Sequence, residues 1–367
     1  MKKKLLKPAC FALVLVLALG LVLSGCSMPA ESNDSSASAA PAATEKAVAA
    51  ETAAAEPAAK VSDSGTAFGA DSNEEYYMVT FLSGIEYWKG CYKGFEAAGK
   101  LYGVKTIYAG AAEYDVNQAV TVFEQIIANN PAGIAVSCIN PDAYKEPIQK
   151  AMDAGIPVVT FDADSPDSGR YSFLATGNVA AGETAAKYLA EALGGKGDVA
   201  VVTLPGQLNH EERTQGFVSK IESDYPDMKV VQTANGGGEQ TTAAQAAAGI
   251  LQANPSVVGL FCTDATSGVG AVAAITENNR TDVKIVSFDT DKGTLDAIKD
   301  GTISASIAQG TWNMGFWSFQ MLFQLKHELI NPTDGWKEKG INPLPPYIDT
   351  GVNVVTKDNV DAFYVSE

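Results

Sequence analysis

The stretches IPVVTFDAD (residues 156–164) and VKIVSFDTD (residues 283–291) decide the fold that this sequence predicts. Each is a run of β-branched and apolar residues that leads into Phe-Asp-x-Asp. An apolar run of this length is typical of a strand buried on both faces, as in a parallel sheet covered by helices. Open α/β sheets bind ligands beyond the carboxyl ends of their strands. Asp162 and Asp289 are therefore predicted at equivalent ligand-facing positions.

The repeat extends upstream of these two strands. AVTVFEQIIANNPAGIAVSCIN (residues 119–140) aligns with AAQAAAGILQANPSVVGLFCTD (residues 243–264) at a constant offset of 124 residues. Both copies are typical of a helix, an Asn-Pro stop and an apolar strand, because proline cannot continue a helix. Two copies of one strand–helix plan predict two similar lobes, with a cleft between them that both sets of strand ends line.

Alternating apolar patterns predict the remaining elements. In the first half we expect strands at 76–84, 105–109, 133–138 and 157–161, and helices at 116–129 and 144–153. In the second half we expect helices at 182–193 and 208–217, and strands at 198–204, 229–232, 302–309 and 347–355. Aromatic residues at helical spacing then predict a core-facing stripe made of Trp312, Phe316, Phe319 and Phe323.

The N-terminal residues predict a targeting signal. Four lysines precede an apolar segment, residues 10–23, that is too short to span a membrane. The segment ends in Leu-Ser-Gly-Cys, which resembles the lipobox of bacterial lipoproteins. We therefore expect a signal peptide at 1–25 and a lipid on Cys26, with a plain secretory signal as the alternative. Residues 26–74 are rich in Ala, Ser, Glu and Pro and are expected to form a disordered tether.

The charge balance excludes some partners. Removal of residues 1–25 leaves 22 Lys and Arg against 43 Asp and Glu. A folded body this acidic is not suited to bind nucleic acid or anionic lipid, so the lipid on Cys26 is the membrane contact that we expect. Cys91, Cys138 and Cys262 lie in apolar segments, at spacings that match no metal framework. We expect small buried thiols, with a disulfide as the alternative.

The sequence carries no motif of a common enzyme class. A nucleophile elbow, a Walker loop and metal-binding histidine spacings are all missing from it. The sequence holds two histidines, His210 and His327, and we expect neither to bind a ligand. The glycine run at 236–238 is weak evidence for phosphate binding. We therefore predict no catalytic residue, no metal and no cofactor.

The strand-end carboxylates are the main candidates for function. Asp162 and Asp289, with Asp164 and Asp264 nearby in the same plan, fit a glycosidase acid/base pair, ligands of a divalent ion, or acceptors for sugar hydroxyls. Nothing in the sequence indicates a carboxyl that is held protonated. A role as helix caps remains an alternative for each aspartate. Other groups suited to a sugar, which stack on it or exchange hydrogen bonds with it, are Tyr87, Trp88, Arg213 and Gln309.

From residue 76 onward the chain resembles the type I periplasmic sugar-binding proteins, the ribose-binding-protein family of ABC transporter receptors. The residues that match the family's ligand positions are Tyr87, Trp88, Asp162, Arg213, Asp289 and Gln309. Ser137 and Asp264 stand where the family commonly has asparagines, and Ala163, followed by Asp164, replaces the usual arginine. Gly238 falls where ribose binders place an aromatic residue. The resemblance therefore implies the scaffold but does not single out ribose.

The resemblance implies two Rossmann-like lobes with parallel sheets, joined by a hinge of three segments near Gly177, Gln309 and Tyr347. Lobe one is expected at 75–177 plus 310–346, and lobe two at 178–309 plus 347–367. The implied function is an extracytoplasmic, monomeric receptor that delivers a pentose, hexose or deoxyhexose to an ABC permease. A carbohydrate hydrolase, or a receptor for autoinducer-2 or a cyclitol, is the alternative. Repressor relatives of this fold bind DNA, but a predicted lipoprotein signal occupies the N-terminus here.

Overall fold

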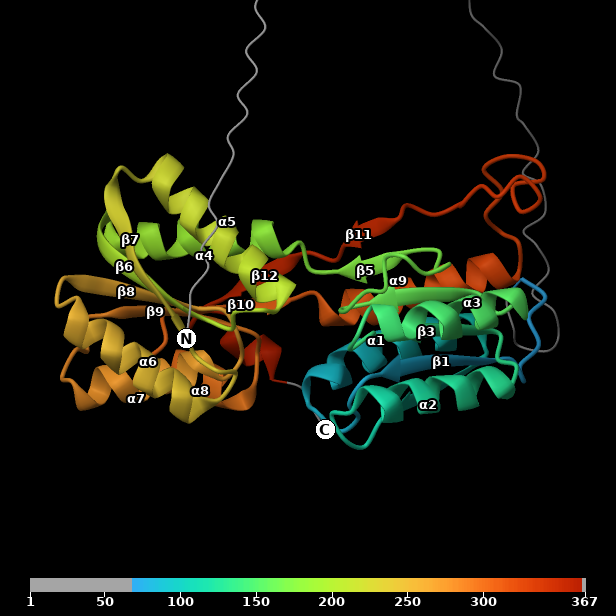
Figure 1. Cartoon of the computed structure of the whole chain (residues 1–367), viewed down its shortest axis with the longest axis horizontal. Helices are drawn as coiled ribbons and strands as arrows, with labels where there is room; N and C mark the ends of the chain where they lie inside the picture. The colour runs from blue at the N-terminus through green and yellow to red at the C-terminus, as the bar shows by residue number, and fades with distance from the viewer. Residues whose placement is uncertain (1–67, 365–367) are drawn as a thin grey trace, which may run out of the picture. The chain divides into compact units, whose positions relative to one another are not determined.

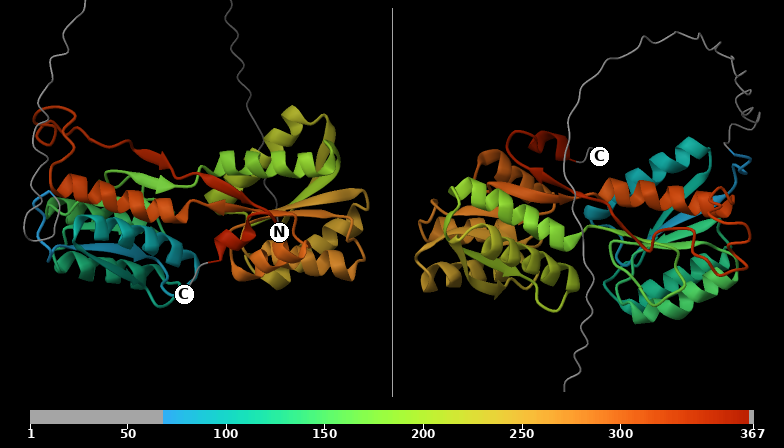
Figure 2. Two further views of the ribbon diagram at one scale, coloured as in Figure 1. Left: turned by 180° about the vertical axis from the view of Figure 1, so that it is seen from behind. Right: turned by 90° about the horizontal axis from the view of Figure 1, so that it is seen from above.

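The computed structural model describes residues 68–364. The predicted signal, Cys26 and the tether up to residue 67 lie outside this part of the chain. The strands form two six-stranded sheets, each with helices on both faces (Figure 1). Figure 2 shows the same layers from behind and from above. Among the described residues, no helix is long and apolar enough to cross a membrane.

The first sheet has the order β11-β5-β4-β3-β1-β2, with every neighbouring pair parallel. Its strands are β1 (Glu75–Thr80), β2 (Lys105–Gly110), β3 (Gly133–Val136), β4 (Val158–Phe161), β5 (Phe173–Ala175) and β11 (Tyr347–Asp349). The helices α1 (Tyr87–Tyr102) and α9 (Thr311–Lys326) cover one face. The helices α2 (Val116–Ala128) and α3 (Lys145–Asp153), the latter preceded by the short 3₁₀ turn η1 (Asp142–Tyr144), cover the other.

The second sheet has the order β12-β10-β9-β8-β6-β7. Its strands are β6 (Lys196–Thr203), β7 (Asp227–Asn235), β8 (Val257–Cys262), β9 (Lys284–Phe288), β10 (Ala305–Gln309) and β12 (Val352–Val355), and β12 pairs antiparallel with β10. One face packs against α4 (Asn178–Leu193) and α5 (Leu208–Asp224). The other packs against α6 (Gln240–Ala253), α7 (Ser267–Glu277) and α8 (Lys292–Asp300), and η2 (Val360–Phe363) follows β12.

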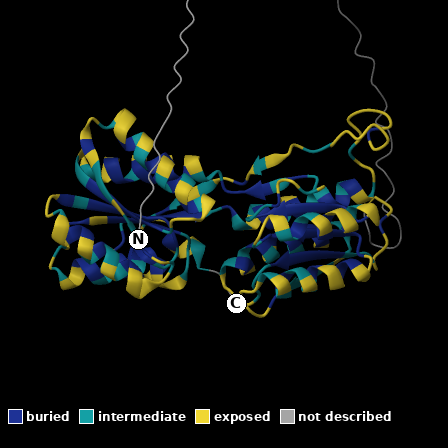
Figure 3. Cartoon of the chain, viewed as in Figure 1, coloured by how far each residue is buried: buried dark blue, intermediate teal, exposed yellow. Residues whose placement is uncertain are grey.

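Alternating burial explains why these segments form central strands. Tyr76 and Met78 of β1 lie in the core under α1 and α9, whereas Tyr77 and Val79 lie in the core under α2. Both faces of the strand are thus buried, as an uninterrupted apolar run predicts. Figure 3 shows the buried residues concentrated in the two sheets and on the inner faces of the helices. The predicted fold class, two α/β lobes with mainly parallel sheets, is confirmed.

Glycines allow the same close helix pair to form in both lobes. A Cβ atom at Gly315 of α9 would overlap the carbonyl of Cys91 in α1. In the second lobe a Cβ atom at Gly182 of α4 would overlap the carbonyl of Arg213 in α5. Because no larger residue fits at Gly182, this contact holds the backbone of α5 against α4 at Arg213, one of the predicted ligand residues.

Three crossings join the lobes, and backbone hydrogen bonds tie them together. The chain passes from β5 to α4 at 176–177, from β10 to α9 at Gly310, and from β11 to β12 at 350–351. Thr350 N donates to Ala175 O at 2.9 Å, and Gly310 N donates to Gly351 O at 3.0 Å. The third crossing thus contacts the second crossing and the end of β5 that leads into the first.

The structure corrects three expectations about elements. The predicted strand at 347–355 is two strands in different sheets, so residues 347–349 pair in the first sheet and not in the second lobe. The short strand β5 was not predicted. In the predicted aromatic stripe Phe319 and Phe323 are buried, but Trp312 is 45% exposed, because the close α1–α9 contact sets the rotation of α9. The three predicted thiols are free and buried, as expected.

Candidate functional site

Asp162 and Asp289 occupy matching places at the carboxyl ends of the two sheets. Asp162 follows β4 and Asp289 follows β9. Both have a left-handed backbone, with φ of 61° and 63°. Their amide groups continue the strand pairing, since Asp162 N donates to Leu174 O and Asp289 N to Ile307 O. Aspartate tolerates this backbone region better than most residues with a side chain. The backbone conformation is therefore one reason why Asp suits both positions.

Asp162 is held within the first lobe by two hydroxyl groups. Tyr87 Oη donates to its Oδ1 at 2.7 Å, and Ser137 Oγ donates to its Oδ2 at 3.4 Å. Burial raises the pKa of the Asp162 carboxyl, while the Tyr87 hydrogen bond and the positive charge of Arg213 oppose the rise. The same burial, together with the charge of Asp162, raises the pKa of Tyr87 far above its usual value, so the phenol stays a donor.

Asp289 is linked to the first crossing through Gln309. Gln309 Nε2 donates to Asp289 Oδ1 at 2.8 Å, and Thr176 Oγ1 donates to Gln309 Oε1 at 2.7 Å. Burial raises the pKa of Asp289 to about 6, although Arg213 and Gln309 act in the opposite direction. A carboxyl with so high a pKa was not indicated by the sequence.

A small pocket brings residues of both lobes together at this edge. Its lining residues are Glu86, Tyr87, Gly90, Asp289, Thr290, Asp291, Gln309 and Thr311. Tyr87, whose hydroxyl donates to Asp162, therefore lines the same pocket as Asp289. The carboxylates are also close enough for the charge of Asp162 to raise the pKa of Asp289.

Arg213 is the positive charge of the site and is 3% exposed. Its Nε donates to Asn178 Oδ1 and its Nη1 to Thr263 O, each at 2.9 Å. The guanidinium lies over the ring of Phe288, 3.7 Å from its centroid, which adds a cation–π contact. Burial lowers the pKa of Arg213, and the charges of Asp289 and Asp162 oppose that effect. Within residues 68–364 no group accepts a hydrogen bond from Nη2, which leaves this donor available to a ligand.

Two predicted site aspartates have their oxygens committed elsewhere. Asp164 accepts from Arg170 Nε at 2.7 Å and Nη2 at 2.5 Å, and also from Thr160 Oγ1 and Ser165 N. Asp264 accepts four hydrogen bonds, from the backbone N–H and the hydroxyl of both Thr266 and Ser267, and thereby caps the start of α7. Asp264 therefore acts as a helix cap, the alternative that the sequence left open. Asp164 forms an ion pair with Arg170 inside the first lobe.

Trp88 lies in the core and not on a cleft wall. It is 2% exposed, and its ring meets Phe81, Tyr87 and Phe161 edge-on. Tyr87, its neighbour in sequence, is the aromatic residue that lines the pocket. Sequence reasoning missed Asn178 and Thr176, which fix Arg213 and Gln309. Both follow the short strand β5, which the sequence does not reveal, so no local signal pointed to them.

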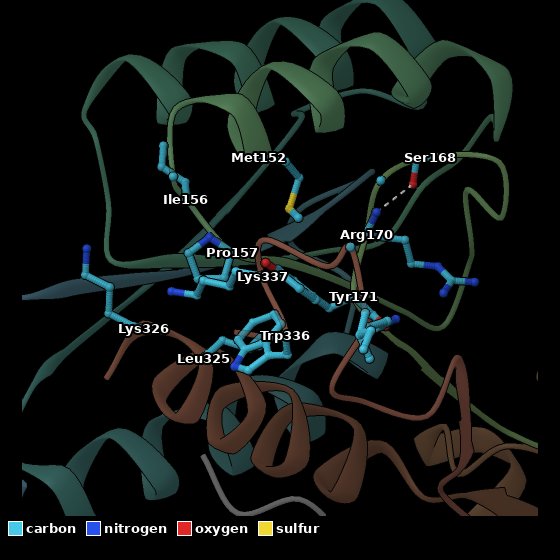
Figure 4. Close-up of a pocket in the computed structure, with 15 residues that line it drawn as sticks. Met152, Ile156, Pro157, Ser168, Arg170, Tyr171, Leu325, Lys326, Trp336 and Lys337 are labelled. Atoms are coloured by element: carbon cyan, nitrogen blue, oxygen red, sulfur yellow. Dashed lines mark hydrogen bonds between the residues drawn. The ribbon is translucent and has the colours of Figure 1, made fainter. Parts of the chain in front are cut away.

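A second pocket lies at the opposite edge of the first sheet (Figure 4). Ile156 and Pro157, just ahead of β4, line it together with Arg170, Tyr171 and Trp336. This is the amino edge of the sheet, whereas ligands bind at the carboxyl edge of open α/β sheets. Figure 4 shows Trp336 and Tyr171 facing this pocket, which contains none of the predicted site residues. Among the described residues, no group of His, Cys, Asp and Glu is arranged to hold a metal ion.

Comparison with known proteins adds to this geometry. Residues 76–328 match the family model of the periplasmic binding protein domain. The ribose import binding protein RbsB of Bacillus subtilis is 28% identical over 218 residues, which cover 59% of this chain and 70% of RbsB. AraP, an arabinose-binding protein from Geobacillus stearothermophilus, is 52% identical, with a TM-score of 0.77 over 80% of this chain and 100% of AraP. A carbohydrate transporter solute-binding protein from Agrobacterium radiobacter, solved with D-arabinose, is 30% identical, with a TM-score of 0.64 over 80% of this chain and 99% of that chain.

Proposed function

The chain belongs to the periplasmic binding protein family, and on that premise we propose that it captures a neutral sugar between its lobes and delivers it to the permease of an ABC importer. The observation that carries this proposal is that Asp162 and Asp289 occupy matching positions in the two lobes. They end equivalent strands of different lobes, and the charge of one buried arginine, Arg213, acts on both carboxyls.

The groups of the site suit a polyol without charge. Asp162 and Asp289 offer acceptor oxygens, while Arg213 Nη2 offers a donor. Sugar hydroxyls donate and accept in the same molecule, so they satisfy both kinds of group. An anionic sugar would place its charge against two carboxylates in a buried site, which is unfavourable. We assign Tyr87, which lines the small pocket, as the aromatic ring that packs on the C–H face of the sugar.

Arabinose is the first sugar to test. AraP, which shares 52% of its residues with this chain, is described as an arabinose-binding protein, and the Agrobacterium radiobacter protein was solved with D-arabinose. We propose a pentose as the ligand, with hexoses and deoxyhexoses as alternative outcomes of the same experiment.

A thermal-shift screen followed by calorimetry tests the proposal. Pentoses, hexoses, deoxyhexoses and cyclitols are each added to the purified protein, and bound sugar is recovered and analysed. A receptor raises the melting temperature by mass action and returns the sugar unchanged. A chemically altered sugar would support a hydrolase, for which a carboxyl with a pKa of about 6, as at Asp289, would suit a general acid. Binding of no sugar at all would contradict the proposed function.

We further propose that the receptor is held at the outer face of the cell membrane by a lipid on Cys26, because Leu-Ser-Gly-Cys follows a short apolar run. The intact mass of the membrane-extracted protein measures this modification. Acyl chains are expected on the wild type and none on Cys26→Ala. An unacylated wild-type protein would contradict the anchor.

We also propose that the lobes close on the sugar about the three crossings at 176–177, Gly310 and 350–351. The hydrogen bonds between these crossings support a common hinge. Small-angle scattering with saturating sugar is expected to show a smaller radius of gyration, and an unchanged radius with bound sugar would count against closure.

A further inference from the structure

His210 lies beside Arg213 in the wall of the second lobe. It occupies the first turn of α5, three residues before Arg213, and is 7% exposed. Residues three apart in a helix share one face. Thr263, which follows β8, contacts both side chains, since its carbonyl accepts from Arg213 and its hydroxyl meets His210 Nδ1 at 3.1 Å. His210 is therefore held at the carboxyl edge of the second sheet, where the proposed sugar site lies.

A chain of hydroxyl groups determines which imidazole nitrogen carries the proton. Thr263 Oγ1 donates its single hydrogen to Thr203 Oγ1 at 3.0 Å. Thr203 Oγ1 in turn donates to the carbonyl of His210 at 3.5 Å, and Thr214 Oγ1 donates to the same carbonyl at 2.8 Å. With its hydrogen used on Thr203, Thr263 can only accept from His210, so Nδ1 carries the proton and Nε2 of the neutral ring is an acceptor.

The ring is neutral at physiological pH. Burial and the charge of Arg213 lower the pKa of His210 to about 4, against smaller opposite effects of the charge of Asp264 and of a hydrogen bond with the backbone of Thr263. The charged groups near the ring come from α5 (Arg213) and from the end of β8 (Asp264). Within residues 68–364, no group donates to Nε2, and this atom is not among the fully enclosed polar atoms.

We propose that His210 Nε2 accepts a hydrogen bond from a hydroxyl of the bound sugar and thereby selects ligands that place a donor at this position. Arg213, one turn along the same helix, supplies a donor beside this acceptor, and only the acceptor at His210 distinguishes a hydroxyl from a carbonyl or carboxylate oxygen. A sugar acid or keto group facing His210 would bring two acceptors together without a hydrogen between them. This inference rests on the proposed sugar-binding function and reverses the expectation that His210 has no role.

Nitrogen NMR of the histidine rings tests the tautomer directly. The chain has two histidines, so a ¹H–¹⁵N spectrum of the rings holds two patterns, and His327→Gln assigns them. We expect His210 to carry its proton on Nδ1 and to show an unprotonated Nε2, whose signal shifts when arabinose, or the sugar found by the screen, is added. A proton on Nε2, or an Nε2 signal that does not respond to bound sugar, would overturn the proposal.

Two substitutions separate the acceptor from the structural contact. The amide of His210→Asn reaches the place of Nδ1 and keeps the bond to Thr263, but it leaves nothing at the place of Nε2. The amide of His210→Gln reaches the place of Nε2 and can restore an acceptor there. We expect His210→Asn to weaken sugar binding roughly tenfold, as for one lost neutral hydrogen bond, and His210→Gln to recover part of the loss.

Sugars that each lack one hydroxyl group identify the hydroxyl that donates to His210 Nε2. In the wild type, one deoxy derivative of the bound sugar is expected to bind roughly tenfold more weakly, and in His210→Asn removal of that same hydroxyl should cost nothing further. If every deoxy sugar loses the same factor in both proteins, the inference fails. The two failures are distinguishable, because absence of sugar binding by the wild type contradicts the proposed function, whereas normal binding without this coupling contradicts the role of His210.

Discussion

Asp162 and Asp289 end strands of different lobes in the same left-handed backbone conformation, with φ of 61° and 63°. This shared geometry decides how each residue should be replaced. Alanine in this conformation is strained by about 1–2 kcal/mol, so a loss of function after Asp→Ala would mix strain with lost chemistry. Asparagine tolerates the same backbone and keeps the shape of the side chain, so Asp→Asn isolates the charge.

We predict that Asp289→Asn stabilises the sugar-free protein at pH 7.5 and weakens sugar binding about a hundredfold. The folded-state pKa of about 6 exceeds the unfolded value, so the stability linked to this carboxyl is present below about pH 4 and lost as the pH rises through 6. Asparagine does not ionise, so the variant avoids this decrease in the free energy of unfolding, which amounts to up to about 3 kcal/mol. Thermal melts at pH 7.5 and pH 4 measure the effect, which should disappear at pH 4. Asp224→Asn, at an exposed ion pair, is the matched control and should change little.

We also predict that sugar affinity decreases as the pH falls through about 6. Protonation of Asp289 removes a charged acceptor from the site, and the charge of Arg213 is then less well balanced. His210 contributes to the pH profile only near its own pKa of about 4. Calorimetry between pH 8 and pH 5 measures the profile, which should become flat in Asp289→Asn. A flat profile in the wild type would show that the ionisation of Asp289 does not matter for binding.

Much of the fold was predictable because its signals are local. The two copies of the helix–strand repeat, and the strands before Asp162 and Asp289, are apolar runs long enough to be recognised without tertiary information. The strand β5 is three residues long and is defined by its pairing with β4 and β11, which the sequence does not reveal. The exposure of Trp312 follows from the rotation of α9, which the contact between Gly315 and the carbonyl of Cys91 sets.

The site was harder to predict than the fold, because a strand-end carboxylate can face a ligand or its own backbone. Asp264 is followed by Thr266 and Ser267, a local pattern that is typical of a helix cap and was available in the sequence. Asp164 pairs with Arg170, on a loop whose path depends on β5. The hydrogen bonds from Tyr87 to Asp162 and between His210 and Thr263 required the three-dimensional structure, because neither residue type indicates its partner.

We predict that Asp164→Ala lowers stability and leaves sugar affinity within about twofold of the wild type. Its side chain and that of Arg170 are 17% and 11% exposed, so removing the carboxylate leaves a poorly solvated guanidinium without its partner. The cost should be about 2 kcal/mol. Melting temperature and calorimetry, measured on the same preparation, test this. Asp164 and Asp289 should thus show opposite patterns, and a large loss of affinity in Asp164→Ala would return Asp164 to the ligand site.

The last prediction concerns the hinge, where Asp349 joins the first and third crossings. Its Oδ1 accepts from Gly177 N and from Gly351 N, both at 2.9 Å. We expect Asp349→Ala to increase hydrogen exchange at these two amides, because each loses its acceptor, while Asp349→Asn should stay near the wild type. The residue is exposed, so the loss of stability should be about 1 kcal/mol.

Gly177→Ala provides a second route to the same contact. The backbone of Gly177 suits alanine, with φ of −68°, but a Cβ atom there would overlap Asp349 Oδ2. We therefore expect Gly177→Ala to destabilise the wild-type protein and to be tolerated in Asp349→Ala, where the overlapping carboxylate is gone. Such a difference is a coupling between the two positions, which a double-mutant cycle of melting temperatures measures. If the two substitutions are additive, Asp349 does not hold the first crossing, and the hinge depends on the backbone bonds of Thr350 and Gly310 alone.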